Sequence, residues 1–151
     1  GRHADTVRRV QESFNERDWE RLVDSIAFDC QFVDPQGQTL RGKVGVRRYA
    51  ISWAAAFSDA RITEPEYYED GDTVVTTFVA RGTHDGQFGP IQPTRRPMEL
   101  PYCEVWQVNP AGLLATGRAY VDLLGLMIQL GVARSPFFVD LTQPLRDASR
   151  Q

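Results

Sequence analysis

Residues 98–109 alternate between two kinds of side chain, and no other feature constrains the fold as tightly. One set is apolar apart from a single acid: Met98, Leu100, Tyr102, Glu104, Trp106 and Val108. The other set points to the opposite side: Glu99, Pro101, Cys103, Val105 and Gln107. A period of two over this length predicts a half-buried strand. Because burying an unpaired charge costs several kcal/mol, the carboxyl of Glu104 is predicted to be paired, protonated or functional.

Composition predicts a single globular domain. The chain has 151 residues, of which 42% are hydrophobic and 25% charged, so it is long enough to bury a core. A net charge of −3 argues against a nucleic-acid surface, and no apolar run approaches the roughly 18–20 residues that span a bilayer. Cys30 and Cys103 are predicted to be structural thiols of a cytoplasmic protein, and a disulfide between them stays open.

Three helices are predicted before residue 58. Each shows apolar residues at helical spacing: Val7, Val10 and Phe14; then Trp19, Leu22, Val23 and Ile26; then Val46, Tyr49, Ala50, Trp53 and Phe57. Asp5 and Asp18 are the expected N-caps of the first two, and Gly42 introduces the third.

The rest of the chain is predicted to be mostly strand. The expected strands span 30–34, 61–69, 73–84, 98–109 and 113–122, with a turn at Asp70-Gly71, a loop over 85–97 and a closing helix over 123–130. The tail contains Pro136-Phe137-Phe138, which we expect to dock on an apolar surface.

Helices followed by a meander of strands is the α+β pattern. We expect one α+β domain over residues 1–132 with a C-terminal tail over 133–151, in which a curved sheet wraps over three N-terminal helices around an apolar pocket. The outward face of this sheet also carries apolar residues that need cover: Val75, Val79, Val105 and Val121. A homodimer or homotetramer is therefore expected.

Two more acids, Asp34 and Asp122, end apolar strand-like segments. Three acids facing one dry cavity would not all be ionised at neutral pH, so one could take a proton while another donated a hydrogen bond. Each acid also has a purely structural interpretation. Asp122 could cap the following helix, Glu104 could pair with Arg118, and Asp34 could start an Asp-Pro turn.

Several segments resemble known families. Similarity to the base-carrying segment of ketosteroid isomerases is seen in Phe32-Val33-Asp34-Pro35, Gly42 and Arg48-Tyr49. Similarity to SnoaL-like polyketide cyclases is seen in Gly82-Thr83-His84-Asp85-Gly86, Pro93-Thr94-Arg95-Arg96, Tyr120-Val121-Asp122, Leu126 and Gln129-Leu130-Gly131. Both families share the cone-shaped α+β barrel of nuclear transport factor 2, and the resemblance covers about residues 5–132.

The resemblance implies roles for all three acids. The cyclase acid matching Asp122 is the acid/base for aldol ring closure, with no metal or organic cofactor. The isomerase acid matching Asp34 moves the proton, and a protonated acid matching Glu104 hydrogen-bonds the enolate oxygen. The isomerase oxyanion tyrosine falls near Val10, and the histidine that cyclases often carry before the final acid is absent from 102–109.

A flat polycyclic or aromatic substrate is the expected partner, with neither nucleic acid nor membrane. The predicted substrate contacts are Trp53, Phe57, Phe78, His84, Tyr102, Trp106, Tyr120 and Met127. His84 could act as an acid/base, but a place at a solvated rim is favoured, and two histidines argue against a histidine metal site. The expected function is a cofactor-independent cyclase or isomerase. A related hydroxylase or hydrolase, or a non-catalytic binding protein, stays open.

Overall fold

Six strands form one mixed sheet in the order β2-β1-β6-β5-β4-β3. The strands are β1 (Ile26–Val33), β2 (Thr39–Arg41), β3 (Arg61–Asp70), β4 (Thr73–Thr83), β5 (Pro97–Val108) and β6 (Leu114–Val121). The helices are α1 (Arg2–Glu16), α2 (Trp19–Asp24), α3 (Gly42–Ala56) and α4 (Leu123–Gln129). β1 and β6 are parallel, whereas the other neighbours are antiparallel. This computed structural model describes residues 1–137.

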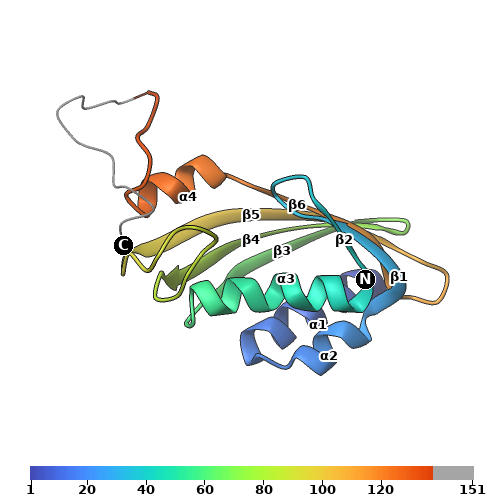
Figure 1. Cartoon of the computed structure of the whole chain (residues 1–151). Helices are drawn as coiled ribbons and strands as arrows, with labels where there is room; N and C mark the ends of the chain where they lie inside the picture. Colours follow the sequence, from blue (N-terminus) through green and yellow to red (C-terminus); the bar gives the residue numbers. More distant parts are fainter. Residues whose placement is uncertain (138–151) are drawn as a thin grey trace.

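The sheet is open and curved, and three helices cover its inner face. Figure 1 shows α1, α2 and α3 below the strands in this view, with α4 above them, beside β5. The predicted α+β architecture is confirmed. Within residues 1–137, none of the helices is both long enough and apolar enough to cross a membrane.

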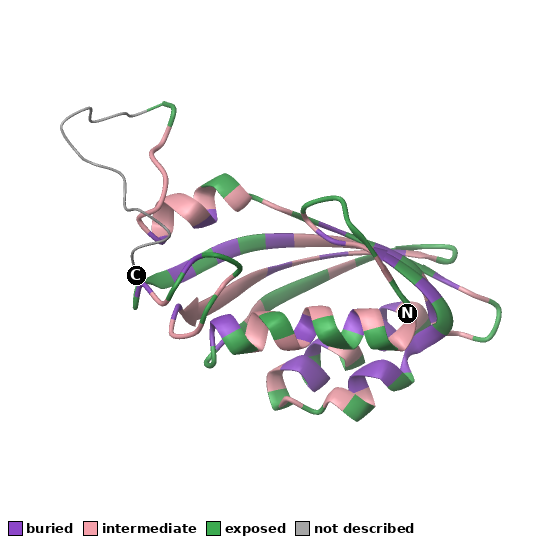
Figure 2. Cartoon of the chain, viewed as in Figure 1, coloured by how far each residue is buried: buried purple, intermediate pink, exposed green. Residues whose placement is uncertain are grey.

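The β4–β5 ladder keeps its register from Thr73, opposite Gln107, to Thr83, opposite Pro97. Unbroken pairing preserves the alternation of side chains along β5, seen as alternating buried and exposed residues in Figure 2. The predicted inward set is confirmed, because its apolar members are all buried: Met98, Leu100, Tyr102, Trp106 and Val108.

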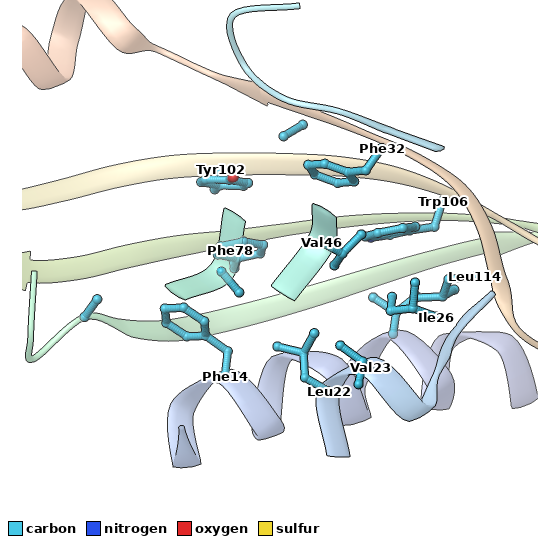
Figure 3. Packing of buried hydrophobic residues seen from close by; sticks show 14 of the residues in the cluster. Phe14, Leu22, Val23, Ile26, Phe32, Val46, Phe78, Tyr102, Trp106 and Leu114 are labelled. Carbon is cyan, nitrogen blue, oxygen red and sulfur yellow. The ribbon is translucent and has the colours of Figure 1, made fainter. Parts of the chain in front are cut away.

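The core fills the space between this face and the helices. Figure 3 shows Trp106, Phe32 and Tyr102 on the sheet side, above Phe14 and Leu22 of the helices. The rings of Phe32 and Trp106 lie 5.1 Å apart. β6 leaves room for them at Gly117, where a Cβ would come within 2.4 Å of the Trp106 ring. A side chain at this position would therefore push the Trp106 indole out of its place.

Two helix starts show local and distant capping. Asp18 caps α2 as predicted, since its carboxylate accepts a hydrogen bond from the Arg21 amide at 3.0 Å. The prediction for Asp5 was wrong, because α1 begins at Arg2 and places Asp5 in its first turn. The first turn of α1 is instead capped by Glu69, whose carboxylate accepts a hydrogen bond from the Ala4 amide at 2.7 Å. Glu69 lies 65 residues after Ala4 in the chain.

Other differences from the predicted elements are small. β1 begins at Ile26, which the helical spacing had assigned to the second helix, and the short strand β2 was not predicted. Cys30 and Cys103 are both free thiols, so the structure has no disulfide between them. Phe137 is 86% exposed rather than docked, and Phe138 lies outside the described residues.

Candidate active site

An apolar cavity of about 80 Å³ lies between the helices and the inner face of the sheet. We call it the inner cavity. Its aromatic lining comes from α1, β1, α3, β4 and β5: Phe14, Phe32, Tyr49, Trp53, Phe78, Tyr102 and Trp106. Glu104 and Gln11 also line it. Gln11 is already engaged, since its Nε2 donates to the Thr76 hydroxyl at 2.8 Å and its Oε1 accepts from Tyr67.

Glu104 is the one acid among residues 1–137 that lines the inner cavity. Its Oε1 accepts a hydrogen bond from the Trp106 indole N–H at 3.0 Å, and no described Lys or Arg pairs with it. Burial raises the pKa of Glu104 from 4.5 to about 7, against the smaller opposing effect of the Trp106 hydrogen bond. The neutral and the ionised form of the carboxyl are therefore both accessible near neutral pH.

The alternative of a Glu104–Arg118 ion pair is wrong. In the β5–β6 ladder Glu104 lies opposite Ala119, and Arg118 lies opposite Val105. Arg118 is therefore on the outward face of the sheet, exposed and stacked near the Tyr120 ring. Because side chains alternate between the two faces along a strand, Glu104 and Arg118 lie on opposite faces of the sheet.

Two tyrosines meet beside Glu104. The hydroxyls of Tyr49, from α3, and Tyr102, from β5, are hydrogen-bonded to each other, and the Tyr102 ring stacks on Phe78 at 4.7 Å. Burial raises the pKa of both phenols, and the nearby Glu104 charge adds to the effect. Both hydroxyls therefore stay protonated at neutral pH. From the sequence, Tyr49 was predicted to belong to a helix stripe and to a segment that resembles ketosteroid isomerases, but not to a site, although its hydroxyl in an otherwise apolar stripe was a usable signal.

Asp34 lies beside a second hollow of about 490 Å³, which we call the mouth groove. Tyr49 and Trp53 line both spaces, so they stand between the inner cavity and the groove. The Asp34 Oδ1 accepts from the amides of Gln36 and Gln38, each at 2.9 Å. The predicted turn-starting role is thus confirmed. A catalytic role for Asp34 stays a prediction.

Asp122 lies outside both spaces. It is exposed, caps α4 by accepting from the Gly125 amide at 2.8 Å, and borders a groove on the outward face of the sheet. The capping alternative is therefore confirmed. The acid/base role that the resemblance implies for Asp122 stays a prediction.

The predicted substrate contacts divide among several places. The inner cavity is lined by Trp53, Phe78, Tyr102 and Trp106, and Met127 lines the mouth groove with Trp53. Phe57 is buried against His84, with ring centroids 5.2 Å apart. Tyr120 is 51% exposed on the outward face. The structure thus brings four of the eight into one cavity.

The favoured placement of His84 at a solvated rim is wrong, because its side chain is fully buried. The backbone of His84 pairs with Arg95 and Arg96, which folds the loop over it. Its Nδ1 accepts from the Thr94 amide at 3.1 Å, and burial lowers its pKa. Its Nε2 has no hydrogen-bond partner in the described part of the chain.

No group of three or more His, Cys, Asp or Glu side chains within residues 1–137 is arranged to hold a metal ion. The absence of a cofactor stays a prediction of the resemblance.

The sequence pattern of SnoaL-like polyketide cyclases matches residues 4–130. The chain belongs to this family. Among solved structures, it is 30% identical to IdmH, a candidate polyketide cyclase from Streptomyces antibioticus, over 87% of this chain and 100% of IdmH, with a TM-score of 0.76. Membership supports a cyclase or isomerase kind of enzyme that acts on a small molecule.

Solved structures of lower sequence identity share the fold. A candidate polyketide cyclase from Xanthomonas campestris pv. campestris is 18% identical, covers 85% of this chain and 96% of its own, and has a TM-score of 0.78. AclR, a candidate hydroxylase from Streptomyces galilaeus, is 16% identical over 85% of this chain and 95% of its own, with a TM-score of 0.74. No curated protein matches the chain.

Proposed function

We propose that this SnoaL-like protein is a cofactor-independent cyclase or isomerase, and that Glu104 carries the proton. One observation supports the choice of Glu104 above all: its carboxyl lies in an apolar cavity with no cation paired to it within residues 1–137. A pKa of about 7 is suited to general acid/base catalysis, because both protonation states are populated near neutral pH.

The shape of the site supports a carbonyl compound with flat, apolar rings. The inner cavity is too small for several fused rings, whereas the mouth groove is about six times larger. A polyketide-like or polycyclic substrate would place its reacting carbon in the cavity and its remaining rings between Trp53, Phe88 and Met127 of the groove.

Aldol ring closure is the reaction that family membership favours. Glu104 takes the proton from the carbon next to a carbonyl, and the resulting enolate carbon attacks a second carbonyl of the same molecule. The new alkoxide oxygen then receives the proton back from Glu104. No oxidant or reductant is consumed, and an isomerisation would differ only in the carbon to which the proton returns.

The test is turnover of Glu104→Gln with a panel of aromatic polyketide-like carbonyl compounds. A general acid/base group contributes about 10²–10⁴-fold, so turnover is expected to fall by that factor while affinity changes little. Glu99→Gln is the matched control, because Glu99 lies on the same strand but is exposed and paired with Arg81.

Turnover of Asp34→Asn and Asp122→Asn is measured in the same way, so that the three acids can be compared. If Glu104→Gln keeps full turnover and one aspartate variant loses it, that aspartate is the acid/base group instead of Glu104. Unchanged turnover in all three would favour a non-catalytic binding protein. Product analysis separates ring closure from the alternative hydroxylase or hydrolase reaction.

A further inference from the structure

The hydrogen-bonding groups around Tyr49 and Tyr102 contain one donor too many. Each phenol can donate one hydrogen bond through its O–H. One O–H is used in the bond between the two phenols. Whichever phenol donates, the O–H of the other has no acceptor within residues 1–137. The cluster therefore offers a free donor to an incoming oxygen.

The position of this donor matches the position of Glu104. Tyr102 and Glu104 are two residues apart on the same face of β5, so their Cα atoms are separated by about 7 Å. Because both side chains leave the same face of the strand and line one cavity, a bound carbonyl group can present its oxygen to the phenols and the C–H of its neighbouring carbon to the carboxyl. Both phenols and Glu104 line the same apolar cavity, where a hydrogen bond to a developing charge is strongest.

We propose that the hydroxyl pair of Tyr49 and Tyr102 holds the developing enolate oxygen of the substrate. The proposal rests on the proposed function of Glu104. As Glu104 takes the proton, the C–H electron pair forms a C=C bond and the carbonyl π pair moves onto the oxygen that the phenols hold. Return of the proton reverses this shift. The substrate therefore enters with an enolisable carbonyl oxygen leading, and planar phenols are expected to bind as mimics of its enolate.

The residues come from elements that the family resemblance does not use for this purpose. The isomerase oxyanion tyrosine falls near Val10, on α1, whereas this pair joins α3 to β5. The two phenols are 53 residues apart in the chain. Removal of either one leaves the other beside Glu104, so the double variant is the informative one.

The experiment follows the ionisation of 2-naphthol bound to the full chain, by its absorbance as pH is varied. Naphthol and naphtholate absorb differently, and the ring oxygen stands in for an enolate oxygen. If the pair donates to that oxygen, the ionisation constant of bound naphthol should fall at least tenfold in the Tyr49→Phe/Tyr102→Phe variant. A purely structural role would leave it unchanged. Tyr68→Phe is the control, because that hydroxyl is exposed and bound to Glu66.

Turnover gives the second readout. The double variant is expected to lose about 10²–10³-fold in kcat, with little change in KM. Loss of activity in Glu104→Gln together with full activity in the double variant would overturn this inference and leave the proposed function standing.

Full activity in Glu104→Gln would overturn the proposed function, and naphthol ionisation would then decide the role of the phenols alone. An unchanged ionisation constant, or no binding of 2-naphthol to the wild type, would overturn that role. If the double variant does not fold, the single variants are measured with an expected smaller shift in the same direction.

Discussion

At the scale of single residues, Glu104 is governed by its surroundings more than by its own chemistry. The same side chain on the outward face of β5, at Glu99, pairs with Arg81 in solvent. At Glu104 the neighbours are aromatic rings and one indole N–H, so desolvation outweighs the single hydrogen bond. An inward position on the strand is thus sufficient to turn an ordinary surface acid into a group that titrates near neutral pH.

This raised pKa gives a testable dependence of stability on pH. In the unfolded chain Glu104 ionises near 4.5, and in the folded chain near 7. Between these values the native state holds one more proton than the unfolded state, so the Glu104 contribution to stability falls as pH rises from about 4.5 to about 7. The full difference corresponds to about 3 kcal/mol.

Urea unfolding of wild type and Glu104→Gln at pH 5 and pH 7.5 measures this contribution. The variant is expected to gain stability relative to the wild type at the higher pH, by a few kcal/mol at most. An identical pH dependence in both proteins would show that Glu104 keeps its ordinary pKa in the fold. Subtracting the two curves removes the contributions of other titrating groups.

At the scale of elements, the loop after β4 depends on a neutral histidine. His84 Nδ1 accepts from the Thr94 amide, while the nearby Asp85 and Arg95 act on the pKa of His84 in opposite directions. Protonation would place a hydrogen on Nδ1 and break this bond. Because burial lowers the pKa of His84, the stability it contributes is lost as pH falls below about 6.5, where the unfolded chain binds the proton first.

Hydrogen exchange can detect this loosening. Amides over residues 84–96 are expected to lose protection between pH 6.5 and pH 5, relative to the amides of β4. His84→Asn is the comparison, because its amide oxygen can accept near the place of Nδ1 but does not titrate. Equal loss of protection in wild type and His84→Asn would contradict the role given to His84.

The start of α4 separates two interpretations of Asp122. As an N-cap, Asp122 can be replaced by Asn at little cost, whereas Asp122→Ala is expected to cost about 1 kcal/mol. If the capping role is the whole role, Asp122→Asn keeps both its melting temperature and its turnover. A loss of turnover in Asp122→Asn at an unchanged melting temperature would instead support the acid/base role that the resemblance implies.

Most elements were predictable because their signals are local. Alternation along β5, the turn after Asp70 and the cap at Asp18 depend on residues within a few positions of one another. Local sequence patterns gave the wrong cap or the wrong element where a residue far along the chain determines the local structure. Glu69 caps α1 from β3, and parallel pairing with Leu114 draws Ile26 into β1 although its spacing also suited a helix.

At the scale of the whole molecule, the site was less predictable than the fold. Glu104 could be identified from its strand alone, because the anomaly is one acid in an apolar set. The phenol pair joins residues 49 and 102, and no local pattern links them. His84 was misplaced for the same reason, since the far arm of its own loop buries it.

The outward face of the sheet supports a prediction about assembly. Apolar side chains there border a groove that includes Val79, Cys103 and Tyr120. We expect a homodimer through this face, so light scattering should give about twice 17.1 kDa. Tyr120→Arg is expected to shift the protein toward the monomer, whereas Phe28→Arg, at an exposed position outside the groove, should not. A monomeric wild type at micromolar concentration would contradict this expectation.

The contact of Trp106 with Glu104 has an optical consequence. The indole is buried against Gly117 and Phe32 and donates its N–H to the Glu104 carboxyl, so its emission depends on whether that carboxyl is charged. With Trp19 and Trp53 replaced by Phe, the remaining fluorescence should titrate with a midpoint near pH 7 and should become flat in Glu104→Gln. A ligand that displaces or protonates the carboxyl would change the same signal. The molecule thus contains its own spectroscopic probe of the group on which its proposed chemistry depends.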